Sequence, residues 1–177
     1  MEQGVILETS RLLLREFRAE DVGPLQAVLG DPVAMQFYPA AYGRAGVEAW
    51  IARNQERYAR DGFGLWAMVL KTTGEVIGDC GCVSQEVDGQ KEIEVGYHVR
   101  RDLWGVGYAT EAAKACMEYA FSKLGAERVI SMIRPENLQS RRVAEKNGLR
   151  CERVIFWHGY EHCIYLKKNE NAHRKSV

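Results

Sequence analysis

The stretch between residues 92 and 124 constrains the fold most, because it changes from a strand pattern to a helix pattern across a glycine-rich loop. Apolar and polar residues alternate strictly from Glu92 to Val99, as they do in a strand with one buried face. The helical stretch from Tyr108 to Leu124 carries a stripe of small residues that can pack tightly on a sheet. The sequence therefore predicts a strand, a loop and a helix in close contact. The polar face of that strand would carry Glu92, Glu94, Gly96 and His98.

The remaining elements combine hairpins with one crossover connection. The predicted strands are residues 12–14, 65–71, 75–83, 127–133, 152–157 and 160–167, and the other predicted helices are residues 21–29, 47–60 and 137–147. The resulting order, β-α-α-β-β-β-α-β-α-β-β, indicates an α/β sheet that is partly antiparallel and partly parallel.

The length and the charge balance of the chain limit its organisation and its partners. The 177 residues fit a single domain, which we place at residues 1–168, followed by a polar tail at residues 169–177. The 24 basic side chains balance the 24 acidic ones, so no overall charge draws the chain to nucleic acid or to an anionic membrane. No window approaches the about 18 apolar residues of a membrane span, and charged residues interrupt the N-terminus before a signal peptide could form. We therefore expect a cytoplasmic protein that binds neither nucleic acid nor membrane.

The five cysteines are irregularly spaced, at positions 80, 82, 116, 151 and 163. Cys80 and Cys82 would place two thiols on one face of a strand, but no CxxC motif or nearby histidine pair completes a zinc set. The pattern predicts small buried hydrophobic side chains and no metal site.

The loop from Arg100 to Glu111 has the features of a phosphate site. Gly105 and Gly107 leave the backbone N–H groups at a helix start unobstructed, and the helix dipole adds about half a positive charge there. A dinucleotide-binding loop would need Gly or Ala at the position of Thr110, and a Walker A loop would need a Gly-Lys-Ser/Thr sequence that the chain lacks. The segment therefore predicts a phosphate loop of another type. A nucleotide-binding α/β protein unrelated to coenzyme A stays open as an alternative.

Four blocks in order resemble the GNAT superfamily of N-acetyltransferases, specifically the branch that includes ribosomal-protein N-terminal acetyltransferases. The blocks cover nearly the whole chain, and they are Thr9–Arg15, Glu94–Tyr97, Trp104–Ala112 and Asn137–Leu149. The wider superfamily usually begins its loop with Gln or Arg, and the Trp104 found here matches that branch.

The resemblance implies a mixed, partly antiparallel central sheet flanked by helices, in which the strands at 92–99 and 127–133 splay apart. Acetyl-CoA would be the co-substrate, and its pantetheine arm would lie in that gap and pair with the backbone as an added strand does. The implied contacts are Tyr97, His98 and Val99 for the pantetheine arm, Trp104, Gly105, Val106, Gly107, Tyr108, Ala109 and Thr110 for the pyrophosphate, Asn137 and Ser140 near the sulfur, and Arg142 with Lys146 for the 3′-phosphate. A solvated helix face is the alternative for Arg142 and Lys146.

Acetyl transfer by direct attack in a ternary complex needs a neutral amine, a site for the oxyanion and a proton for the leaving thiolate. Similar enzymes often place a carboxylate beside the thioester, which implies Glu94 as the general base, with Glu92 as the fallback and His98 as a further proton acceptor. The alternative for Glu94 is a solvated residue or the partner of an arginine. The superfamily's acidic tyrosine corresponds here to Ser140, which could protonate the thiolate or only satisfy the backbone at a helix start. A backbone N–H near Tyr97 or His98 would hold the oxyanion.

The acceptor implied by the resemblance is a primary amine, either a protein N-terminus or a small molecule. Aromatic residues from Phe37 to Tyr42 lie in a loop broken by Pro and Gly, which suits an acceptor pocket. No acidic cluster is present between residues 31 and 46, which favours a peptide or a small neutral acceptor over a polycation. The final strands could pair in a homodimer. A non-catalytic acyl-CoA-binding regulatory module is the alternative function.

Overall fold

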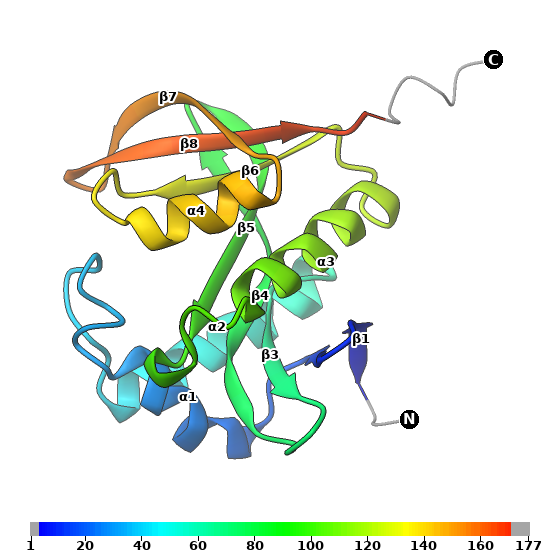
Figure 1. Cartoon of the computed structure of the whole chain (residues 1–177), viewed down its shortest axis with the longest axis vertical. Coiled ribbons are helices and arrows are strands. Elements are labelled where there is room, and N and C mark those ends of the chain that lie inside the picture. Colours follow the sequence, from blue (N-terminus) through cyan, green and yellow to red (C-terminus); the bar gives the residue numbers. More distant parts are fainter. Residues whose placement is uncertain (1–3, 171–177) are drawn as a thin grey trace.

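The computed structural model describes residues 4–170, and their strands form one sheet in the order β1-β2-β3-β4-β5-β6-β8-β7. Figure 1 shows this sheet with its helices. The strands are β1 (Val5–Glu8), β2 (Leu12–Arg15), β3 (Leu65–Leu70), β4 (Val76–Val87), β5 (Gln90–Val99), β6 (Arg128–Ile133), β7 (Arg150–Trp157) and β8 (Tyr160–Lys168). The helices are α1 (Val22–Leu29), α2 (Arg44–Asp61), α3 (Tyr108–Ser122) and α4 (Leu138–Lys146), with short 3-10 helices η1 (Ala19–Asp21) and η2 (Arg101–Leu103).

Two hydrophobic clusters divide the helices between the two faces of the sheet. The first cluster joins α3 and α4 to alternate residues of β2, β3 and β4, including Trp66 and Cys80. The second cluster joins α1 and α2 to the intervening residues of β3, such as Ala67 and Val69. Because side chains alternate along a strand, both faces of β3 are buried, and helices cover both faces of this part of the sheet. This arrangement confirms the predicted α/β class.

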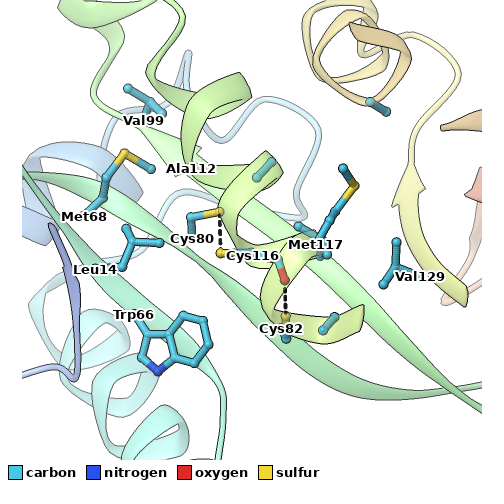
Figure 2. Close-up of a cluster of buried hydrophobic side chains, with 14 of the residues drawn as sticks. Leu14, Trp66, Met68, Cys80, Cys82, Val99, Ala112, Cys116, Met117 and Val129 are labelled. Carbon is cyan, nitrogen blue, oxygen red and sulfur yellow. Dashed lines mark hydrogen bonds between the residues drawn. The ribbon is translucent and has the colours of Figure 1, made fainter. Parts of the chain in front are cut away.

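Small side chains allow α3 to pack closely against β4 (Figure 2). Cys80 Sγ lies 3.5 Å from Cys116 Sγ, and the Cys82 thiol donates a hydrogen bond to the Cys116 carbonyl at 3.4 Å. Burial raises the pKa values of the Cys82 and Cys116 thiols, so both remain protonated. The prediction of buried thiols is confirmed for Cys80, Cys82, Cys116 and Cys163, and it is wrong for Cys151, which is exposed near the start of β7.

The strands β5 and β6 splay apart, as the resemblance implied. They are parallel, and among the described residues their ladder pairs Glu94 with Ile130 alone. The other neighbouring strands are antiparallel with continuous or bulged ladders. Beside that single pair, the Ser131 hydroxyl donates to the Val95 carbonyl at 2.7 Å and satisfies a backbone group that a ladder would otherwise use. The gap therefore opens along β5 toward Val99.

Several elements differ from the sequence prediction. Strand β4 continues past its predicted end at Val83 to Val87, where it pairs with Gln90 of β5. Strand β1 was not predicted, because its four residues pair only with β2 at the sheet edge and carry no long alternation. Helix α2 begins at Arg44 rather than at Val47, because Gly43 provides an extended N-cap residue. At the other end of the chain, β8 ends at Lys168, and residues 171–177 of the predicted tail lie outside the described residues.

Candidate active site

The phosphate loop connects β5 to α3 and needs glycine at two positions. Gly105 and Gly107 have φ values of 80° and 95°, in a region that other residues rarely adopt. Gly107 is the N-cap residue of α3, and no side chain caps the helix there. The exposed backbone at Gly105 and the N–H groups of the first turn therefore remain available to an anion. This geometry fits the pyrophosphate of acetyl-CoA.

A partly buried ion pair between Arg11 and Glu111 holds the start of α3 in place. Glu111, in its first turn, accepts hydrogen bonds from Thr9 Oγ1 at 2.6 Å, Ser10 Oγ at 3.0 Å and Arg11 N at 2.9 Å, and it pairs with Arg11 Nε at 2.6 Å. Partial burial raises the pKa of Glu111, but these hydrogen bonds outweigh it and lower the pKa to about 2. The Arg11 guanidinium also donates to the Val106 carbonyl at 3.2 Å. No local pattern in the sequence indicates this role of Glu111, although Glu111 and Arg11 both lie in blocks that carry the family resemblance.

Trp104 attaches the other end of the loop to β5. Its indole N–H donates to the Val99 carbonyl at 2.8 Å, so the side chain closes the end of the strand. A ligand on this loop would therefore meet the backbone of Trp104 rather than its indole N–H.

Tyr97, Ser140 and Asn137 come together where α4 begins beside β5. The Tyr97 hydroxyl donates to the Ser140 carbonyl at 2.8 Å, and the Ser140 hydroxyl donates to Tyr97 Oη at 3.1 Å. Asn137 Oδ1 accepts from the Ser140 N–H at 3.1 Å, which makes Asn137 the N-cap of α4. Burial raises the pKa of Tyr97, so its phenol stays protonated. The sequence predicted backbone roles for Tyr97, in cofactor binding and at the oxyanion, and no local pattern places its phenol beside Ser140.

Glu94 lies at the point where β5 and β6 separate, on the opposite face of β5 from Tyr97. It accepts a hydrogen bond from Gln85 Nε2 at 3.0 Å. Burial raises the pKa of Glu94, while the hydrogen bonds from Gln85 and the Met132 backbone and the charge of Arg57 oppose that rise. Glu94 is therefore neither fully solvated nor held in a direct arginine pair, which were its alternative readings.

Glu92, the fallback base, has another role. Its side chain is buried and forms a bidentate ion pair with Arg128, with Nε at 3.0 Å from Oε2. This ion pair joins β5 to the start of β6, two residues before the Glu94–Ile130 pair on each strand. Glu92 therefore stabilises the sheet at the end where the two strands are still together.

His98 lies on the same face of β5 as Glu94 and is part of a chain of hydrogen bonds that was not predicted from the sequence. Its Nδ1 lies 2.7 Å from Asp79 Oδ1, and its Nε2 lies 2.6 Å from Tyr38 Oη. Asp79 is fully buried and also accepts from Trp50 Nε1 at 2.9 Å. Asp79 and His98 are direct partners across β4 and β5, which is why they meet. A lone acid within the apolar stretch 76–83 was the available signal.

The loop before α2 (light blue in Figure 1) lies beside the C-terminal end of β5, where Tyr38 contacts His98. Asp31 at its start pairs with Arg101 at 3.0 Å, and the Phe37 carbonyl accepts from Arg134 Nη1 at 3.4 Å. Arg101 follows β5 and Arg134 follows β6, so these contacts tie the loop to both strands of the splay. Of the predicted acceptor segment at residues 37–42, Phe37 and Tyr38 thus lie near the open end of the gap, whereas Tyr42 packs against Trp50 of α2.

The gap therefore has two chemically different sides. The side of α3 and α4 has helix-start amides and the hydroxyls of Tyr97 and Ser140, while the side of α1 and α2 has Glu94 and His98. Arg142 and Lys146 are exposed on α4. Within residues 4–170 no cluster of three or more His, Cys, Asp or Glu side chains is arranged to hold a metal ion. No helix of that part is long and apolar enough to cross a membrane.

Comparisons with known proteins agree with this geometry. Residues 11–150 match the model of the acetyltransferase (GNAT) domain family. The chain is 35% identical to the Bacillus subtilis protein YkkB over 93% of this chain and 96% of that protein. An acetyltransferase structure from Agrobacterium tumefaciens is 25% identical and superposes with a TM-score of 0.80, covering 92% of this chain and 94% of the other. A structure of RimL, the ribosomal L7/L12 α-N-protein acetyltransferase, in complex with coenzyme A, has a TM-score of 0.70 at 16% identity, covering 93% and 97%.

The match to the family model spans most of the chain, and the splayed strands and phosphate loop have the geometry expected of that family. This protein therefore belongs to the GNAT family and is an acetyl-CoA-dependent acetyltransferase.

Proposed function

We propose that the protein transfers the acetyl group of acetyl-CoA to a primary amine by direct attack in a ternary complex. The observation that carries this proposal is the placement of Glu94 and the Tyr97–Ser140 pair on opposite faces of β5, beside the gap. A thioester that enters from the side of α3 and an amine that enters from the side of α1 and α2 would meet in that gap. Acetyl-CoA supplies the acetyl group and leaves as the thiol.

Glu94 is the general base in this proposal. Burial raises the pKa of Glu94, which brings a carboxylate closer to the range where it can accept a proton and later release it at neutral pH. Gln85 Nε2 donates to one carboxylate oxygen at 3.0 Å, which restricts the orientation of the Glu94 side chain.

Ser140 and Tyr97 protonate the leaving thiolate in this proposal. The Ser140 hydroxyl is a weak acid by itself, but it donates to the phenol of Tyr97 at 3.1 Å. In this step the Tyr97 hydroxyl turns from the Ser140 carbonyl to the sulfur, and its O–H bond breaks as the S–H bond of coenzyme A forms. The Ser140 proton moves to Tyr97 Oη along their hydrogen bond, and solvent returns a proton to Ser140. The remaining cofactor contacts that we propose are the backbone of residues 97–99 and 104–110, Asn137 beside Ser140, and the exposed Arg142.

We propose a peptide N-terminus or a small amine as the acceptor. RimL, which shares the fold, is named as an α-N-protein acetyltransferase. The loop over the acceptor face presents aromatic side chains, and an α-amine with a pKa of about 7.7–8.0 is partly neutral near pH 7. Strand β7 forms one edge of the sheet, which leaves pairing of the final strands in a homodimer as a prediction.

Release of free thiol from acetyl-CoA with a panel of amines and N-terminal peptides tests this function. Wild type should turn over with one acceptor class, and Glu94→Gln should lose about 10²-fold or more in kcat. Glu86→Gln is the matched control, because Glu86 is an exposed glutamate on the neighbouring strand. The melting temperature with acetyl-CoA should rise for all three proteins. Binding without turnover on any amine would contradict the proposed reaction and favour the regulatory module.

A further inference from the structure

Tyr38, His98 and Asp79 form a chain of hydrogen bonds that runs from a partly exposed phenol to a fully buried carboxylate. Asp79 accepts from Trp50, so its second oxygen is left for His98 Nδ1 at 2.7 Å. A carboxylate at Nδ1 places the imidazole proton there, and Nε2 then has a lone pair that accepts from the Tyr38 hydroxyl at 2.6 Å. The direction of the chain is therefore fixed: Tyr38 donates to His98, and His98 donates to Asp79.

The chain lies on the face of β5 from which the amine would approach. Tyr38 comes from the loop tied to Arg101 and Arg134 at the open end of the splay, and 39% of its surface is exposed. Burial raises the pKa of Tyr38, and the carboxylates of Asp79 and Glu94, followed by the phenols of Tyr42 and Tyr97, raise it further. The guanidinium of Arg57 lowers the pKa of Glu94. Two negative groups and one imidazole thus surround a phenol that borders solvent.

Acceptance of a protonated amine requires two proton removals, and Glu94 can account for only one of them. An alkylamine with a pKa of about 10.4 is almost entirely an ammonium ion at pH 7, so it must lose one proton before attack and a second one after it. The leaving thiolate takes back one proton in total. The other proton needs a route to solvent.

We propose that Tyr38, His98 and Asp79 are a proton relay that takes the first proton from the ammonium group of the acceptor. The N–H bond of the ammonium breaks as an O–H bond forms on Tyr38, and the original O–H bond of Tyr38 breaks as an N–H bond forms on His98 Nε2. Asp79 stabilises the imidazolium, and His98 returns the proton to solvent by way of Tyr38. This inference rests on the proposed function and adds that the site serves amines that are charged at neutral pH.

The test compares two acceptors whose amines differ in pKa. With wild type at pH 7, we expect measurable kcat/KM for an alkylamine of pKa about 10.4 and for an α-amine of pKa about 8. In Tyr38→Phe and His98→Gln, kcat/KM for the alkylamine should fall by about 10²-fold, while the loss for the α-amine should stay below about tenfold. Raising the pH to about 9.5 should restore much of the alkylamine rate, because the neutral amine no longer needs the relay.

Controls separate the relay from a structural effect. Tyr119→Phe removes a phenol hydroxyl from α3, on the other face of the sheet, and should leave the ratio of the two rates unchanged. If His98→Gln reduces stability, Tyr38→Phe carries the test, since its ring lies at the surface. Equal losses for both amines would overturn the relay and leave the proposed function intact. Absence of thiol release by wild type with either amine would overturn both.

Discussion

Arg11 Nε lies 2.6 Å from Glu111 Oε2, and this contact joins the segment before β2 to the first turn of α3 across 100 residues of sequence. The same guanidinium reaches the Val106 carbonyl at 3.2 Å and lies 4.4 Å from the centre of the Tyr108 ring. One side chain therefore contacts the phosphate loop on both sides of Gly107. The conformation of the loop therefore depends on a residue that lies outside the loop.

Loss of this ion pair should weaken acetyl-CoA binding. We expect Glu111→Gln to raise the KM for acetyl-CoA several-fold with a smaller change in kcat, because the amides of the loop would no longer be held in place. Steady-state kinetics with a saturating amine measure both constants. Glu118→Gln, an exposed position on the same helix, is the control. A fall in kcat with no change in this KM would contradict the positioning role.

The same carboxylate should contribute to acid stability. Its folded pKa of about 2 is below the unfolded value of about 4.3, so its stabilisation is present above pH 4.3 and is lost as the pH falls toward 2. The contribution is on the order of 1 kcal/mol after allowance for solvent screening. Urea unfolding at several pH values between 5 and 2 should show a difference between wild type and Glu111→Gln that shrinks as the pH falls. A constant difference would argue against this linkage.

Glu94 should destabilise the fold while serving catalysis. Because burial raises its folded pKa, ionisation is less favourable in the folded state, and the penalty is absent at low pH and full above the folded pKa. Glu94→Gln should therefore raise the melting temperature at pH 8, by about 2–4 °C for a gain of roughly 1 kcal/mol, and have little effect at pH 4. Differential scanning calorimetry measures this, with Glu86→Gln as the reference. An inactive variant with an unchanged melting temperature at pH 8 would mean that the site does not penalise the charge.

The hydroxyls of Tyr97 and Ser140 should act as one unit. Tyr97→Phe and Ser140→Ala each remove a member of the 3.1 Å hydrogen bond, so each should lower kcat by roughly tenfold or more. The fall in kcat for the double variant should be much smaller than the product of the two single falls. Once one hydroxyl is removed, the hydrogen bond between the two is already lost, so removal of the second has less effect. Single-turnover thiol release measures all four proteins. Losses that multiply would show that the two hydroxyls act independently.

Local patterns in the sequence were sufficient to predict the strand, loop and helix at the centre of the site. Alternation from Glu92 to Val99 placed Glu94 and His98 on one face and Tyr97 on the other, because a strand has a fixed period of two residues. The two glycines predicted an open loop, and both have positive φ. These features depend only on neighbours within a few positions, so they are readable before the fold is known.

The partners of those side chains were decided only by the tertiary structure. Asp79 meets His98 because β4 and β5 pair in one register, and Tyr38 meets His98 across 60 residues because the loop is tied to both splayed strands. Glu92 and Glu94 lie two positions apart on one face, yet only Glu92 is beside Arg128 at the start of β6. The sequence by itself determined on which face of its strand each side chain lies. The order and register of the strands decided which other side chain it contacts. Contacts between distant segments arise from the packing of the whole sheet, and no local periodicity records them.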